Sequence, residues 1–173
     1  GEDSVVFLLD SPDGDQGFPG ELKISVKYTL TKENAVDILY AVTSDRDTPV
    51  NMTNHAYFNL GGHDSGSVSD TRVQILADSI PTGEILAVEG TPMDFRTPKT
   101  IGTDIGSDYI QIVQGKGFDH NWCLNHAPGI CGLAASAYHE ASGRAMDVYT
   151  DLPGVQFYRQ LAGRRKRKGR RFL

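Results

Sequence analysis

The chain has 173 residues, 39% of them hydrophobic, and a formal net charge of −5 at pH 7. This length and composition fit one domain with a hydrophobic core. No run approaches the roughly 18 apolar residues of a transmembrane helix, and the acidic residues 1–4 are unlike a secretory signal, so the composition argues against a membrane protein. Because the first residue is Gly1 rather than Met, we expect the chain to begin inside a longer open reading frame.

Strands are predicted from the beginning of the chain. Residues 5–9 are the first candidate, and residues 36–43 are another. In residues 22–30, apolar side chains alternate with Lys, Ser and Thr, and this period of two favours a half-buried strand over a helix. Residues 12–20 contain three glycines and two prolines, which predicts a tight loop with positive φ angles.

Residues 53–60 place an imidazole and a phenol two residues apart in a segment that we predict to be a strand. Because side chains alternate between the faces of a strand, His55 and Tyr57 would share a polar face opposite a mostly apolar one. Gly61 and Gly62 would end the strand. Such a polar row suits a polyhydroxylated ligand; the alternative is a solvated strand face with an incidental histidine.

More strands are predicted further along the chain, at residues 72–76, 133–138, 145–150 and 155–158. Residues 117–121 combine a carboxylate and an imidazole, and we expect them to form a loop just before Trp122. No amphipathic helix is evident. Many short strands separated by Gly and Pro predict a single all-β domain, either a sandwich or a barrel.

The spacing of the cysteine and histidine residues indicates the redox state of the compartment and whether a metal site is expected. Cys123 and Cys131 bracket a short loop and form no disulfide framework, which fits a reducing compartment and predicts a cytoplasmic protein. No pair of candidate ligands has the short spacing of a structural zinc site, so we expect no metal.

Positive charge is concentrated at the C-terminal end. All 22 acidic residues precede residue 159, whereas residues 159–173 hold 8 of the 17 basic residues, so residues 1–158 carry 9 basic and 22 acidic groups. We predict a folded domain at residues 1–158 and a disordered basic tail at residues 159–173. The tail could mark a nuclear-localisation or nucleic-acid patch. We favour a non-native terminus, because the acidic body repels phosphate and no tail aromatic precedes Phe172.

Five segments in this order resemble the aldose 1-epimerases, the galactose mutarotases. They are residues 12–20 (PDGDQGFPG), 53–60 (TNHAYFNL), 92–96 (PMDFR), 117–121 (GFDHN) and 151–158 (DLPGVQFY). The resemblance covers about residues 5 to 158. It implies part of a large antiparallel β-sandwich, the supersandwich of the family, with an open sugar-binding cleft. It also implies cofactor-free interconversion of the α and β anomers of aldohexoses such as galactose and glucose.

The resemblance also implies site residues. His55 matches the general acid of the family, and histidine as a residue type suits that role because its ordinary pKa of ~6.5 lets it hold or release a proton at neutral pH. Tyr57, Asp119 and Gln156 match substrate contacts. Read without the family, Tyr57 would be a packed aromatic, Asp119 a turn-capping residue and Gln156 a surface strand residue.

Two departures from the family pattern leave two hypotheses open. The first departure is that family members have additional N-terminal strands with a sugar-binding Arg and His, which would precede residue 1 of this sequence. The second is that family members have a general-base Glu beyond the Gln-Phe-Tyr motif, whereas residues 159–173 contain no acidic residue. The first hypothesis is an aldose 1-epimerase with impaired activity in this chain. The second is a non-catalytic sugar-binding or scaffold derivative whose basic tail recruits an anionic partner. The oligomeric state and the preferred aldose stay open.

Overall fold

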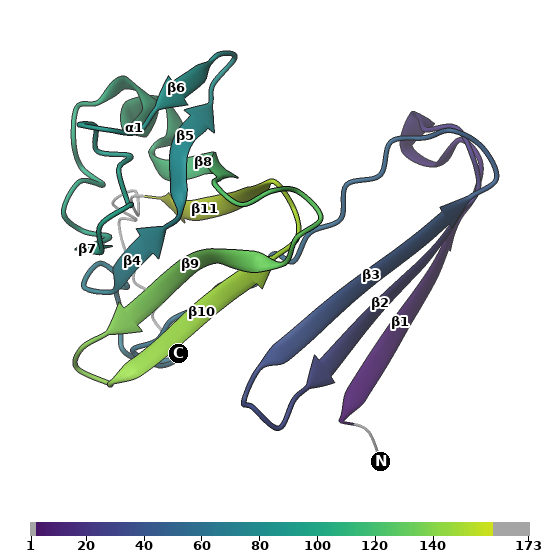
Figure 1. Cartoon of the computed structure of the whole chain (residues 1–173), viewed down its shortest axis with the longest axis horizontal. Coiled ribbons are helices and arrows are strands. Elements are labelled where there is room, and N and C mark those ends of the chain that lie inside the picture. The colour runs from purple at the N-terminus through teal and green to yellow at the C-terminus, as the bar shows by residue number, and fades with distance from the viewer. Residues whose placement is uncertain (1–2, 161–173) are drawn as a thin grey trace, which may run out of the picture. The chain divides into compact units, whose positions relative to one another are not determined.

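The computed structural model describes residues 3–160, which divide after Tyr57 into two compact units (Figure 1). Their strands form three sheets in which all described pairings are antiparallel. The predicted all-β, antiparallel fold class is therefore confirmed. Most of the predicted basic tail, residues 161–173, lies outside the described residues, and the domain bounds at residue 158 stay a prediction.

The first unit is a three-stranded meander. Its strands are β1 (Ser4–Ser11), β2 (Leu22–Leu30) and β3 (Val36–Ser44), paired in the order β1-β2-β3. The pairing with β3 runs along the whole of β2, from Leu22 opposite Ser44 to Leu30 opposite Val36, and the pairing with β1 runs from Leu22 to Thr29. The three strands predicted in this part of the sequence are thus confirmed.

The loop between β1 and β2 is as tight as its glycines predicted. A short 3-10 helix, η1 (Asp15–Gly17), forms within it. Gly20 has a φ of 94° and donates its N–H to Asp13 Oδ1 at 2.7 Å. A Cβ atom at Gly20 would also lie 2.8 Å from Ser44 Oγ, so the loop closes on the end of β3 only because residue 20 has no side chain.

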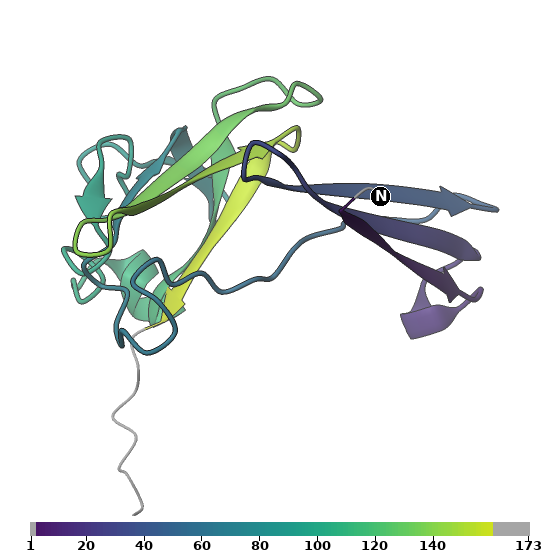
Figure 2. The same ribbon diagram turned by 90° about the horizontal axis from the view of Figure 1, so that it is seen from below.

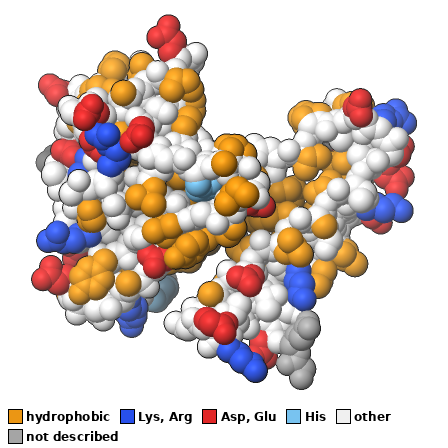
Figure 3. All heavy atoms as spheres, in the orientation of Figure 1, with side chains coloured by type: hydrophobic (Ala, Val, Ile, Leu, Met, Phe, Trp, Pro, Cys, Tyr) orange, Lys and Arg blue, Asp and Glu red, His pale blue; other side chains and the backbone are white. Residues whose placement is uncertain are grey.

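One face of this sheet is almost entirely apolar. Cross-strand register places the side chains of Val5, Phe7, Leu9, Ile24, Val26, Tyr28, Ile38, Tyr40 and Val42 on the same side. Val5, Phe7 and Leu9 remain 48%, 58% and 60% exposed. Hydrophobic side chains at the surface of the described residues are coloured orange in Figure 3. The buried hydrophobic core of the described chain lies instead in the second unit.

The second unit contains two four-stranded sheets. The first has the order β10-β9-β4-β7, formed by β10 (Arg144–Thr150), β9 (Gly132–His139), β4 (Arg72–Ile75) and β7 (Lys99–Thr100). The second has the order β11-β8-β5-β6, formed by β11 (Gly154–Gln160), β8 (Gly117–Leu124), β5 (Ala77–Pro81) and β6 (Ile85–Ala87). The strands predicted around β4, β9, β10 and β11 are confirmed, and β11 continues through Arg159 and Gln160.

A single residue links the two sheets of this unit. Leu76 separates β4 from β5, and its backbone N–H donates to Ala134 O at 2.9 Å while its carbonyl accepts from Asn125 N at 3.0 Å. The chain therefore passes directly from one sheet into the other (Figure 1, Figure 2). The core of the unit is built from fourteen buried residues: Val73, Ile75, Ala77, Ile80, Val88, Met93, Phe95, Ile101, Ile105, Ile112, Phe118, Trp122, Leu124 and Ala134.

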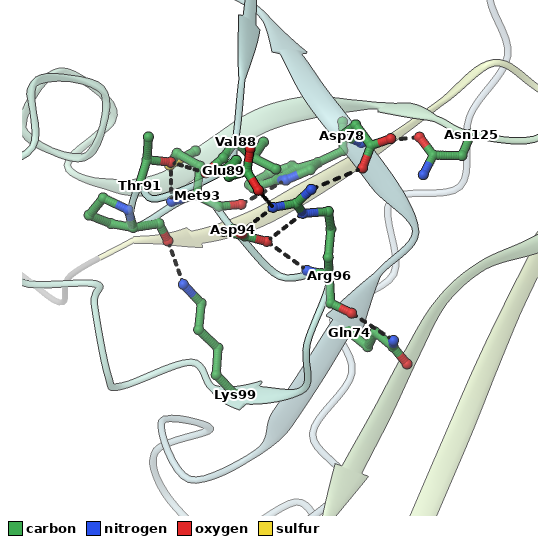
Figure 4. A network of polar contacts seen from close by, with 12 residues as sticks. Gln74, Asp78, Val88, Glu89, Thr91, Met93, Asp94, Arg96, Lys99 and Asn125 are labelled. Atoms are coloured by element: carbon green, nitrogen blue, oxygen red, sulfur yellow. Dashed lines mark hydrogen bonds and ion pairs between the residues drawn. The ribbon is translucent and has the colours of Figure 1, made fainter.

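The PMDFR segment is fixed over this core by side chains on both of its sides. Trp122 Nε1 donates to Met93 O at 3.1 Å, and Gln74 Nε2 donates to Arg96 O at 2.8 Å. Arg96 binds Asp94 through Nε at 3.0 Å and Nη2 at 2.8 Å (Figure 4). Hydrogen bonds from Arg96 hold the pKa of the Asp94 carboxyl below its usual value, against an opposing effect of burial. These hydrogen bonds hold the motif as an ordered loop against the core.

Two sequence predictions in this unit were wrong. Residues 117–121, expected as a loop, belong to β8, because antiparallel pairing with β11 along this stretch outweighs the turn tendency of Gly and Asp. A helix is also present, α1 (Ile110–Gly115), whose six residues are too few to show an amphipathic period in the sequence. Among the residues that the structure describes, no helix is long and apolar enough to cross a bilayer.

Candidate active site

The strand pair β8–β11 has one apolar and one polar face. Phe118, Trp122 and Leu124 alternate along β8 into the core. Asp119 and Asn121 lie on the opposite face, and the register places Tyr158 beside Asp119 and Gln156 beside Asn121. The two family-like motifs at residues 117–121 and 151–158, which are distant in sequence, therefore contribute polar groups to the same sheet surface.

Asp119 and Gln156 are in direct contact on this polar face. Gln156 Nε2 donates to Asp119 Oδ1 at 2.9 Å, and both residues are exposed. The bond leaves the second carboxylate oxygen and the amide oxygen of the pair as acceptors. Such a cluster can receive the hydroxyl groups of a sugar without metal or cofactor atoms.

Gly154 makes room for this arrangement. It lies opposite Cys123 in the β8–β11 ladder, and a Cβ atom built on it would collide with the amide of Asn121. The missing side chain thus leaves room for the Asn121 amide on the polar face. We infer that the glycine of the DLPGVQFY motif allows β11 to pack closely against Asn121.

His120 lies on the core side of β8, away from Asp119. Its ring meets Trp122 edge-on with the centroids 6.2 Å apart, and its Nδ1 accepts from Asp119 N at 3.1 Å. Burial lowers the pKa of His120, and the nearby Asp119 carboxylate opposes this with a smaller rise. His120 therefore supports the strand as a neutral acceptor and does not face the polar surface.

The segment with His55 and Tyr57 differs from its prediction. Residues 51–59, expected to enter a strand at residue 53, have no regular secondary structure. A strand needs a partner to bind its backbone, and alternation of side chains in the sequence does not supply one. His55 and Tyr57 are both exposed, and their rings still approach each other, with centroids 5.2 Å apart and planes tilted by 45°.

A local turn shapes the start of this segment. Asn54 Oδ1 accepts from Ala56 N at 3.0 Å, which closes an Asx-type turn around His55. Asn54 Nδ2 also donates to the phenol oxygen of Tyr28, on β2, at 3.0 Å. Met52 and Thr53 line a shallow hollow beside Tyr28 and Tyr40 on the apolar face of the sheet. The first unit therefore holds the segment just before His55.

The structure brings the four predicted site residues together as two pairs. Asp119 and Gln156 bind each other in the second unit, and the rings of His55 and Tyr57 are neighbours at the end of the first. In residues 3–160, no group of three or more His, Cys, Asp or Glu side chains is placed to hold a metal ion. The catalytic and binding roles of the four residues stay predictions.

Comparison with known proteins identifies the family. The family model described as aldose 1-epimerase matches residues 2–169. The chain belongs to the aldose 1-epimerase family. A galactose mutarotase from Mus musculus is 46% identical over 162 residues, which cover 89% of this chain and 45% of that protein. An aldose 1-epimerase from Escherichia coli (strain K12) is 41% identical, covering 89% and 46%.

Solved structures agree with this assignment to the aldose 1-epimerases. A galactose 1-epimerase from Lactobacillus acidophilus NCFM aligns with a TM-score of 0.68 at 35% identity, covering 79% of this chain and 41% of that one. An aldose epimerase homologue from C. elegans aligns with a TM-score of 0.75 at 27% identity, covering 89% and 47%. The chain spans about half the length of the curated relatives it matches.

Sequence reasoning missed the residues that bind the chain on either side of His55 and Tyr57 in this aldose 1-epimerase family member. Tyr28 was read only as part of an apolar strand face, yet it binds Asn54. Ser142 and Arg144, in and after the turn between β9 and β10, bind the backbone that follows Tyr57. No local signal marks such residues, because their partners are 26 to 84 positions away in the sequence.

Proposed function

We propose that this chain carries the general acid and part of the sugar-binding surface of an aldose 1-epimerase, which interconverts the α and β anomers of aldohexoses such as galactose and glucose. Family membership supports the reaction class, and the relatives are named galactose mutarotase and aldose 1-epimerase. The polar face of β8–β11 supports the sugar as the ligand class.

The observation that carries this proposal is the hydrogen bond from Gln156 to Asp119. It joins two motifs 37 residues apart on an exposed polar surface of a sheet whose other face is core. A carboxylate beside a primary amide offers acceptors and a donor within one sugar ring's width. This combination recognises vicinal hydroxyl groups, which aldohexoses present.

In the proposed mechanism His55 acts on the ring oxygen. Its imidazolium donates a proton to O5 while a base removes the proton of the C1 hydroxyl, so the C1–O5 bond breaks and C1 becomes an aldehyde. Rotation about C1–C2 turns the other face of the carbonyl toward the C5 hydroxyl. On reclosure the C5 hydroxyl attacks C1 and returns its proton to His55, while the base returns its proton to the C1 oxygen, and the opposite anomer is formed.

We propose that activity of this chain is impaired because the residue that serves as the family's general base is missing from it. No Asp or Glu follows Asp151 in the sequence, so no residue after the Gln-Phe-Tyr motif can fill the role of the family's general base. Water would then accept the C1 hydroxyl proton. Loss of a positioned base reduces the rate by about 10²- to 10⁴-fold.

Polarimetry of freshly dissolved α-galactose tests the acid directly. We expect the chain to accelerate mutarotation above buffer and His55→Ala to abolish that acceleration. His63→Ala is the matched control, because His63 is an exposed histidine in a nearby turn, with a side chain 98% exposed. Equal rates for the chain and for His55→Ala would refute the role of His55.

A side-by-side assay with the Mus musculus galactose mutarotase tests the impairment. We expect this chain to be slower by about 10²- to 10⁴-fold, and rates within tenfold of the relative would show that another group replaces the base. Galactose binding without any conversion would favour the non-catalytic sugar-binding alternative. Salt-dependent binding of an anionic partner through residues 159–173 would further support that alternative.

A further inference from the structure

Asn121 is a third polar residue on the face that carries Asp119 and Gln156. It lies two residues after Asp119 on β8, and the register with β11 places it opposite Gln156. Side chains two residues apart on a strand point to the same face, and so do residues opposite each other on paired antiparallel strands. The three side chains therefore form one continuous polar row, which lies entirely within the second unit.

The amide of Asn121 has hydrogen-bonding capacity that the fold does not use. Its side chain is half-buried, yet within residues 3–160 no hydrogen bond joins its amide to another residue. The amide atoms are not enclosed, so they can be reached from solvent. An asparagine amide offers two N–H donors and one oxygen that accepts. All of these groups of Asn121 are therefore available to a ligand on the polar face.

The absence of a side chain at Gly154 determines where this amide lies. A Cβ atom built on Gly154 would collide with Asn121 Oδ1 and would lie 3.1 Å from Asn121 Cγ. Gly154 does not have a positive φ, so its backbone conformation does not itself require glycine. The space above residue 154 is what the Asn121 amide occupies. A larger side chain at this position would displace the amide from its place in the polar row.

We propose that Asn121 is a third sugar-binding residue, which donates hydrogen bonds to hydroxyl oxygens of an aldohexose beside Asp119; the inference rests on the proposed function for its ligand. The Asp119 carboxylate only accepts hydrogen bonds, and it already takes one N–H of Gln156. A sugar hydroxyl is both a donor and an acceptor, so it needs N–H groups as well as carboxylate oxygens. Residues two apart on a strand are separated by about 6.6 Å, so Asp119 and Asn121 reach different hydroxyl groups of one ring.

Side-chain amide signals in NMR report contact between galactose and Asn121 directly. In an isotope-labelled full chain, the Asn121 signals are identified by their absence from Asn121→Ala. We expect them to shift on addition of galactose and to saturate with the same Kd as the side-chain signals of Gln156. The signals of Gln114, an exposed residue of α1, should not move. Unmoved Asn121 signals at a galactose concentration that saturates Gln156 would overturn the proposal.

Asn121→Ala and Gly154→Ala should weaken galactose binding for the same reason. We expect each to raise the Kd by on the order of fivefold to tenfold, because the first removes the amide and the second displaces it. In the Asn121→Ala background, Gly154→Ala should change the Kd by less than about twofold, since the displaced group is already gone. Gln114→Ala is the control and should leave the Kd unchanged. An unchanged Kd in Asn121→Ala, or fully additive effects in the double variant, would contradict this role of Asn121.

The binding measurements separate this inference from the proposed function. If Asp119→Asn weakens galactose binding and Asn121→Ala does not, the inference fails while the proposed sugar-binding surface stands. If Asn121→Ala weakens binding but the unaltered chain does not accelerate mutarotation, the proposed catalysis fails and Asn121 remains a sugar contact. Absence of galactose binding by the unaltered chain would overturn both.

Discussion

Replacement of Phe95 by Ala should strongly destabilise the second unit. Phe95 is 1% exposed, and its ring makes edge-on contacts with Phe118, Trp122 and Phe157 at centroid distances of 5.1, 6.0 and 5.5 Å. Truncation of a buried Phe typically costs about 3–5 kcal/mol of unfolding free energy. Aromatic pairs of this geometry add about 0.5–1.5 kcal/mol each beyond burial, so we expect a loss near the upper end, about 4–5 kcal/mol.

Urea unfolding followed by fluorescence measures this loss, because Trp122 is the single tryptophan and lies in the same core. Phe95→Leu keeps part of the buried area and should lose roughly half as much, which keeps a folded variant measurable. Phe58→Ala is the control, since Phe58 is 61% exposed and should change stability by less than about 1 kcal/mol. A loss below about 1 kcal/mol for Phe95→Ala, or equal losses for both alanine variants, would refute this account of the core.

Three further predictions concern the site and its supports. Burial lowers the pKa of His120 below its ordinary value of 6.5. As the pH falls from 6.5 toward the lowered pKa, the unfolded chain therefore binds more protons than the folded chain does. The unfolding free energy should decrease over that range. Urea midpoints across this range should show that slope, and His120→Gln should flatten it; a slope unchanged in His120→Gln contradicts the assignment. Asp119→Asn should weaken galactose binding by on the order of tenfold in an NMR titration, because a charged acceptor is lost; an unchanged Kd would remove Asp119 from the binding surface. Tyr28→Phe should speed hydrogen exchange at Ala56 several-fold, since the phenol no longer holds Asn54, whereas the exposed Tyr149→Phe should not, and equal effects would show that Tyr28 does not support the turn.

Alternating side chains in the sequence predicted a strand correctly where the folded chain supplies a partner strand. The alternation in residues 22–30 marks β2 correctly, because one apolar face and one polar face are what a sheet of this kind presents. The glycines of residues 12–20 likewise predicted a tight turn, and Gly20 has the positive φ that such a turn requires.

The same reasoning failed where a distant partner decides the structure. Residues 51–59 alternate as a strand would but have no ladder, while residues 117–121 look like a turn and pair with β11 through the register Asp119–Tyr158. Pairing energy between strands is not encoded in either segment alone. This is also why neither the spacing nor the family resemblance, which implied only that each side chain contacts the sugar, predicted the hydrogen bond between Gln156 and Asp119.

We propose that His55 of this chain protonates the ring oxygen of the sugar. Magnetisation transfer between the α and β anomeric protons of galactose measures ring opening at equilibrium, without a change in optical rotation. We predict exchange above buffer that rises linearly with chain concentration and returns to the buffer rate in His55→Ala, while His63→Ala matches the unaltered chain. Exchange that persists in His55→Ala would contradict the assignment of the acid.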